Sequence, residues 1–215
     1  MRKLVLISLV AVLAFGLAGA AFGTGKRVTV GTMSGGNWIP FWGPSYSGMR
    51  FQTLIDQSQI GNAGTINEVE YYGYYGYGGE FLKYRVLLGH TALSALTTTF
   101  DNNWKGTPVE VANAAAFAIP AVKNFFPLKL TKTFTYNNTD NLLIEIVWDG
   151  KTGSPTGEPI YSCTFGSGIH RVYALGLPSN PTGSGDTLCY YCRLSFGAYT
   201  GISPTSLGRV KALYE

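Results

Sequence analysis

Charged side chains are scarce in this 215-residue chain, at 13% of all residues. The 16 Lys and Arg residues outnumber the 12 Asp and Glu residues only slightly, and two of the basic residues, Arg2 and Lys3, lie at the extreme N-terminus. A protein that binds nucleic acid usually carries a strongly basic face, so this balance argues against a nucleic-acid partner. Long runs of Glu, Lys, Leu and Ala, which are typical of helices, are also missing.

Histidine is rarer still, because His90 and His170 are the only two. A Ser-His-Asp or Cys-His mechanism would have to use one of them, and neither lies in a recognised nucleophile motif. Glycine-rich phosphate loops and zinc-ligand spacings are absent. Two Asx-rich turns, 101–103 and 138–141, leave a calcium site open as an alternative to simple backbone capping. We therefore expect no enzyme activity, no cofactor and no metal.

Three cysteines are present: Cys163, Cys189 and Cys192. The last two have the spacing of a redox motif, but no βαβ pattern surrounds them. In an extended segment they would point to opposite faces, so a bridge from Cys163 to one of them is easier than a bond between the two. The alternatives are one structural disulfide or buried thiols.

The N-terminus has the pattern of a secretory signal peptide. Arg2 and Lys3 form a basic region, residues 4–17 are almost continuously apolar, and small residues follow before a cleavage point. We expect residues 1–23 to be a signal helix and the mature chain, 24–215, to be secreted or displayed on the cell surface. An uncleaved anchor is the alternative. No later stretch reaches spanning length, so no membrane contact is expected after signal removal.

The rest of the chain reads as short strands separated by turns. It contains 28 Gly, 14 Tyr and 12 Phe, a composition that favours strands over helices. Turn signals recur about every ten residues, which predicts an all-β, single-domain antiparallel β-sandwich, jelly-roll-like, with about nine to eleven strands. The expected strands are residues 26–32, 49–55, 65–72, 82–88, 109–111, 126–136, 141–150, 159–165, 169–175, 187–196 and 207–214. A helical turn is expected within 91–100 and a polar loop at 151–158.

Residues 141–150 stand out as the predicted central strand. Alternate residues are apolar on one face, and the other face is also partly apolar around Glu145, so both faces are expected to be covered. The turn at 137–140 predicts a hairpin with the strand before it. A carboxylate inside such a strand must be paired, hydrogen-bonded or next to a groove, which makes Glu145 the residue to inspect.

Aromatic residues gather in two loop-like segments. Trp38, Phe41 and Trp42 lie among glycines and prolines, and the second segment, 71–79, is too rich in glycine for a good central strand. Both segments either pack against the fold or form a surface for glycans or for assembly. The second segment contributes Tyr71, Tyr72, Tyr74, Tyr75 and Tyr77.

Several blocks resemble a β-sandwich domain that recurs in secreted and cell-surface proteins of environmental bacteria. The similar blocks read Arg50-Phe51-Gln52, Gly61 to Ile66, Gly89-His90-Thr91 and Asn141 to Glu145, and they extend over about two thirds of the mature chain. The resemblance implies a sandwich fold and no agreed catalytic role. In that family the domain accompanies others, whereas here it follows a signal peptide alone.

We therefore expect a secreted structural protein, the subunit of an extracellular filament, surface layer or matrix. The expected partner is another copy of the chain, joined by donation of residues 24–32, in which Val28 and Val30 are the apolar members. The alternative is a carbohydrate-binding adhesin that uses exposed Trp and Tyr. Asn137 begins an Asn-Asn-Thr sequon and is a candidate glycosylation site.

Overall fold

The computed structural model describes residues 25–162 and 168–197, with the side chains of 74–77 and 158–162 excepted. The predicted signal helix, the strand expected at 207–214 and Cys163 lie outside the described residues. One short helix, α1 (Gln57–Ile60), and one 3-10 helix, η1 (Phe100–Asn103), accompany the strands. The thirteen strands of the described part are β1 (Lys26–Val30), β2 (Gly35–Gly36), β3 (Gly48–Ile55), β4 (Gly64–Thr91), β5 (Lys105–Phe117), β6 (Phe125–Pro127), β7 (Phe134–Tyr136), β8 (Asn141–Asp149), β9 (Lys151–Ser162), β10 (Arg171–Leu175), β11 (Ser184–Asp186), β12 (Cys189–Tyr190) and β13 (Cys192–Phe196).

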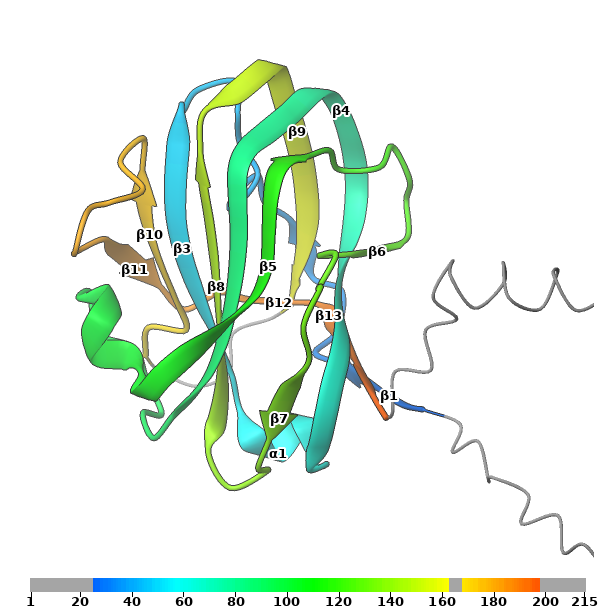
Figure 1. The fold of residues 1–215 in the computed structure, drawn as a ribbon, viewed down its shortest axis with the longest axis vertical. Coiled ribbons are helices and arrows are strands. Elements are labelled where there is room, and N and C mark those ends of the chain that lie inside the picture. The colour runs from blue at the N-terminus through cyan, green and yellow to red at the C-terminus, as the bar shows by residue number, and fades with distance from the viewer. Residues whose placement is uncertain (1–24, 163–167, 198–215) are drawn as a thin grey trace, which may run out of the picture.

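The strands form two antiparallel sheets that pack face to face as in a sandwich (Figure 1). In the first sheet, β1 pairs with β13, β13 with the start of β4, and β4 with β6 and β7. In the second sheet the order is β5, the end of β4, β8, β3, β10 and β11. The prediction of an all-β, antiparallel, sandwich-like fold is confirmed.

Strand β4 belongs to both sheets, because its 28 residues bend from one to the other. Strands β8 and β9 follow the same bend, separated only by Gly150, whose φ is 103°. Arg85 faces Val147 on one side of the bend and Gly79 faces Gly153 on the other. The sequence predicts two strands, 65–72 and 82–88, with the glycine-rich segment between them, and a loop at 151–158. One continuous strand and β9 form instead, so the break and the loop were wrong, although the pairing of β4 with β9 is irregular between Gly73 and Gly79.

The glycines at this bend explain the error. A Cβ atom on Gly79 would lie 1.9 Å from the carbonyl oxygen of Thr152, and one on Gly153 would lie 2.3 Å from that of Gly78. Both glycines also have positive φ, at 137° and 60°. Glycine is therefore required by the close approach of two bent strands, and here it does not interrupt the strand.

The main core lies between the sheets. Phe51 from β3, Tyr84 from β4 and Trp148 from β8 are fully buried there, and burial of one such side chain contributes about 1.5–3 kcal/mol. The Trp148 indole N–H donates to the carbonyl oxygen of Pro40, 2.8 Å away. This bond ties the loop after β2 to the central strand and satisfies a polar atom in an apolar setting.

Three further expectations differ from the structure. The segment 126–136 forms two short strands, β6 and β7. The turn at 137–140 joins β7 in the first sheet to β8 in the second, so it makes no hairpin. No α-helix forms within 91–100, and the nearest helical turn is η1. In each case contacts with segments distant in the sequence, such as the bond from Leu128 N–H to the Val69 carbonyl oxygen and that from Leu96 N–H to the Ile169 carbonyl oxygen, accompany the departure from the local pattern.

A second, smaller apolar cluster covers the outer face of the second sheet. Residues 92–104 cross that face, and Leu96 and Phe100 from this segment are buried against Leu54, Leu143 and Val172. This cover explains why β8 is apolar on both faces, as its sequence predicts.

Candidate functional site

The most concentrated polar chemistry of the described residues lies around Glu145, on the outer face of the central strand β8. Glu145 is 4% exposed and faces Gln52 across the β3–β8 pair. Its carboxylate accepts a hydrogen bond from Gln52 Nε2 at 2.7 Å and one from Arg50 Nε at 3.1 Å. Arg50 and Gln52 alternate with core residues on β3, so the strand period itself aims both side chains at β8.

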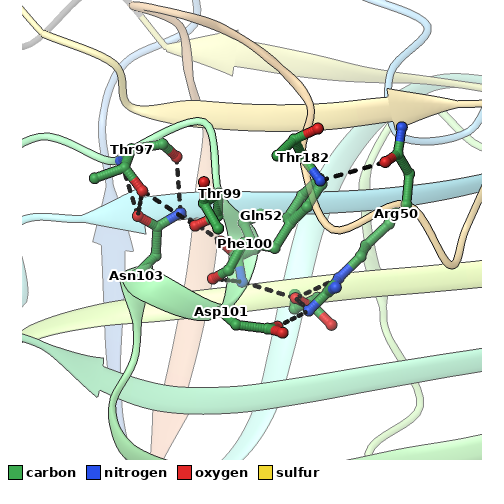
Figure 2. A network of polar contacts seen from close by, with 10 residues as sticks. Arg50, Gln52, Thr97, Thr99, Phe100, Asp101, Asn103 and Thr182 are labelled. Carbon is green, nitrogen blue, oxygen red and sulfur yellow. Dashed lines mark hydrogen bonds and ion pairs between the residues drawn. The ribbon is translucent and has the colours of Figure 1, made fainter.

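The same two residues of β3 hold the covering segment. Gln52 Nε2 also donates to the carbonyl oxygen of Phe100, and Asn103 Nδ2 donates to Gln52 Oε1 at 2.9 Å. Arg50 Nη2 lies 2.7 Å from Asp101 Oδ1. Figure 2 shows the Arg50 and Gln52 side chains directed at η1, with Asn103 bonded in turn to Thr97.

Burial raises the pKa of Glu145, while the charge of Arg50 and the hydrogen bond from Gln52 oppose that shift. No buried side-chain atom of the polar network drawn in Figure 2 is without a hydrogen-bond partner. This network positions residues 92–104 on the sheet. Its buried side chains bond to one another, while the Asp101 side chain keeps 73% of its surface exposed. We interpret the network as a structural clamp.

The predicted aromatic loop residues separate into core and surface. Phe41 is fully buried and packs against the rings of Phe81, Phe117 and Phe126. Trp38 and Trp42 are half-buried, and Trp42 meets Tyr46 edge to face at 5.6 Å. Phe41 is therefore inaccessible to a ligand or a neighbouring copy in this fold, whereas both tryptophans keep part of their surface.

The tyrosine segment separates in the same way. Tyr71 is fully buried and stacks on Tyr190, so its ring is also inaccessible. Tyr72 is half-buried on the outer face of the first sheet. The side chains of Tyr74, Tyr75 and Tyr77 lie outside the described part of the structure.

An aromatic cluster on the first sheet escaped the sequence reading. Tyr72 contacts the rings of Phe125 and Tyr191 at 5.2 and 5.8 Å, and the Arg193 guanidinium lies 4.3 Å from the Phe125 ring centre. Arg193 also forms two hydrogen bonds with Glu70 across the strand pair. The sequence indicated only Tyr72, because the other members come from segments far apart in the chain.

The predicted donor segment is paired inside its own chain as β1. Val28 faces Leu194 and Val30 faces Cys192. Val30 is 2% exposed and Val28 is half-buried, whereas Lys26, Arg27 and Thr29 are exposed. β1 is an edge strand, and β13 is the only described strand with which it pairs.

The cysteines of the described part are buried. Cys189 faces Ser162, the residue before Cys163, across the β9–β12 pair. Burial raises the pKa of the Cys192 thiol, and the nearby Cys189 adds to the shift. A high thiol pKa disfavours redox chemistry at this position.

Both histidines have structural surroundings. His90 Nε2 accepts the backbone N–H of Asn137, and burial is the main cause of its lowered pKa. His170 is 7% exposed. Asn137 is exposed, but its side-chain amide caps the turn by bonding to Asp140 and to the backbone of Thr139.

The part of the chain that the structure describes contains no clustered metal ligands and no long apolar helix. Within residues 25–162 and 168–197, His, Cys, Asp and Glu side chains do not gather in threes as a metal centre would need. No helix in these ranges has the length and apolar character to cross a bilayer.

Comparison with known proteins adds no assignment: no family model matches the chain, and no curated protein or solved structure is significantly similar to it. The resemblance to secreted β-sandwich domains of environmental bacteria stays a prediction.

Proposed function

We propose that this protein is a secreted structural subunit that polymerises by exchanging its N-terminal strand between copies. The observation that carries the proposal is the position of β1, a five-residue edge strand held by one partner, β13. If β1 of a neighbour took this place, the same hydrogen bonds and the same burial of Val30 would be made between copies. A jelly-roll connectivity and cleavage of residues 1–23 belong to this proposal.

Two other properties support a structural role. The apolar leader with Arg2 and Lys3 is the pattern of an exported chain. The polar groups that a mechanism would need are instead bonded to one another around Glu145.

The native cysteine opposite Val30 provides a direct test. A Val30→Cys substitution places a thiol across from Cys192 in an antiparallel pair, where Cα atoms lie about 4.5–5.5 Å apart and a disulfide can form. Oxidised monomers should carry the bond within one chain. Oxidised assemblies should give a ladder of covalent multimers on a non-reducing gel.

Thr29→Cys is the matched control, since residue 29 faces Arg193 and has no cysteine to meet. It should give no ladder. Assemblies of Val30→Cys that release only internally linked monomers would refute strand exchange, and so would a mature protein that never assembles.

A glycan-binding adhesin is the second candidate, and the partly exposed tryptophans favour it. Trp38 and Trp42 lie in one loop and keep accessible surface, as stacking platforms for sugars do. Specific binding on a glycan array that is lost in Trp38→Ala or Trp42→Ala would support this function; an array with no specific signal would exclude the candidate.

A further inference from the structure

Strand β5 forms one edge of the second sheet, and half of that edge is open. On one side β5 pairs with β4 along its length. On the other side, the Val111 carbonyl oxygen accepts the backbone N–H groups of Thr131 and Lys132. From residue 112 to 117, no backbone hydrogen bond joins β5 to any described segment other than β4. Alternate N–H and C=O groups of these six residues therefore face outwards.

The other described edges carry the usual protection against pairing. β1 has Lys26 and Arg27, both exposed, at its start. β6, β7 and β11 are three residues each, and β6 ends in Pro127. Short length, positive charge and proline all discourage the addition of a strand. Residues 112–117 read Ala-Asn-Ala-Ala-Ala-Phe and have none of these features.

We propose that this open edge of β5 pairs antiparallel with the same edge of a second copy. The contact is separate from the exchange of β1 and does not depend on it. Two backbones related by a two-fold axis would supply each other's missing hydrogen bonds and join the second sheets of two molecules into one.

The sequence of the edge suits a second copy of itself. Pairing about a two-fold axis near residue 115 sets neutral, mostly small side chains of the segment 112–117 against one another, so no like charges within that segment meet. The nearest acid, Glu110, is held towards its own chain by Asn113 Nδ2 at 2.9 Å and by Arg85 at 3.7 Å. Asn113 and Ala115 are exposed, so the outer face at this edge is not covered by the rest of the fold.

The test uses Val30→Cys monomers whose internal disulfide to Cys192 has formed, because β1 exchange is then blocked. Sedimentation velocity should show a concentration-dependent dimer of this locked protein. Adding Ala115→Lys should weaken self-association at least about tenfold, because two ammonium groups meet near the two-fold axis. Ser179→Lys, on an exposed neighbouring loop, should leave the dimer unchanged.

Two variants of opposite charge distinguish a lost contact between copies from a failure of the variant to fold. Ala115→Lys and Ala115→Glu should each be monomeric alone, and their equimolar mixture should dimerise. Locked protein that stays monomeric up to about 1 mM would overturn the proposal. An association that Ala115→Lys does not weaken, or a mixture that fails to restore the dimer, would overturn it as well. None of these results bears on β1 exchange, which the ladder experiment decides.

Discussion

Two tyrosines in the core carry hydroxyl groups that have no partner among the described residues. Tyr71 and Tyr84 are fully buried, and burial raises the pKa of both well above the usual value. The Tyr84 ring stacks on Phe117 with a centroid distance of 4.2 Å. A buried hydroxyl without a hydrogen bond opposes folding, so ring packing rather than polarity keeps these residues in place.

Replacing Tyr84 with Phe should therefore raise the free energy of unfolding by about 1 kcal/mol, since the stacked ring stays and the unsatisfied hydroxyl goes. Urea denaturation measures the change. Tyr136→Phe is the matched control: its buried ring also stays, but its hydroxyl donates to the Asp140 carbonyl oxygen, and its loss should lower stability by a similar amount. A destabilised Tyr84→Phe would mean that a bound water satisfies the hydroxyl.

The raised pKa of Glu145 predicts a pH dependence. The folded state holds this proton more readily than the unfolded chain, whose carboxyl has the ordinary value of 4.5. The contribution of Glu145 to stability is then fully present below that value and is lost as the pH rises through the raised folded pKa. Between about pH 4 and about pH 7, wild type should lose stability relative to Glu145→Gln. The opposite trend in urea unfolding would mean that the charge of Arg50 dominates over burial.

Among the elements, the bend shared by β4, β8 and β9 restricts residue choice most tightly, because two backbones approach each other there. Gly79→Ala would bring a Cβ atom to within 1.9 Å of a backbone oxygen at a φ of 137°. We expect a loss above about 4 kcal/mol, measured by thermal or urea unfolding. Gly106 has a φ of 82° with nothing within 4 Å of the added atom, so Gly106→Ala should lose only about 1 kcal/mol. Equal effects would mean that the bend relaxes.

The sequence predicted those elements whose side chains alternate between two environments. Residues 49–55 and 141–150 became β3 and β8 with nearly the expected bounds, and β8 is central as its two apolar faces indicated. The first part of β9, residues 151–158, was predicted to be a loop because Gly153, Pro155 and Gly157 are local turn signals, whereas its end overlaps the strand expected at 159–165. Their strand conformation depends on contact with β4, which no local pattern contains.

Of the polar site, the sequence predicted only the residue whose charge is unusual among its apolar sequence neighbours. Glu145 was identified because a carboxylate is costly within an apolar strand. Its partners Arg50 and Gln52 were not, because the pairing of β3 with β8 joins segments about ninety residues apart. The same limit applies to Phe41, Tyr71 and Tyr72: all three are aromatic, but how far each is buried depends on segments distant in the sequence.

At the scale of the whole molecule, β1 shields the final strand of the described fold. Cys192 is fully buried opposite Val30, and its thiol pKa is raised. In the intact monomer, alkylation of Cys192 by a short iodoacetamide pulse should be at least about tenfold slower than in a chain lacking residues 24–31. Peptide mass spectrometry measures the alkylation of this cysteine separately from that of the others. A denatured sample gives the upper limit of the alkylation rate. Equal rates would mean that β1 does not cover Cys192.

The pairing of β1 with β13 joins the first and last strands of the described chain. When the polypeptide is synthesised from its N-terminus, β1 is complete long before β13. The residues between the two strands must therefore fold while β1 is still unpaired. When β13 appears, the strand that fills the vacant edge is decided by local concentration. A chain released alone closes on itself, whereas chains released side by side compete for one another's edges. The choice between monomer and polymer would then be made by the timing and crowding of chain release.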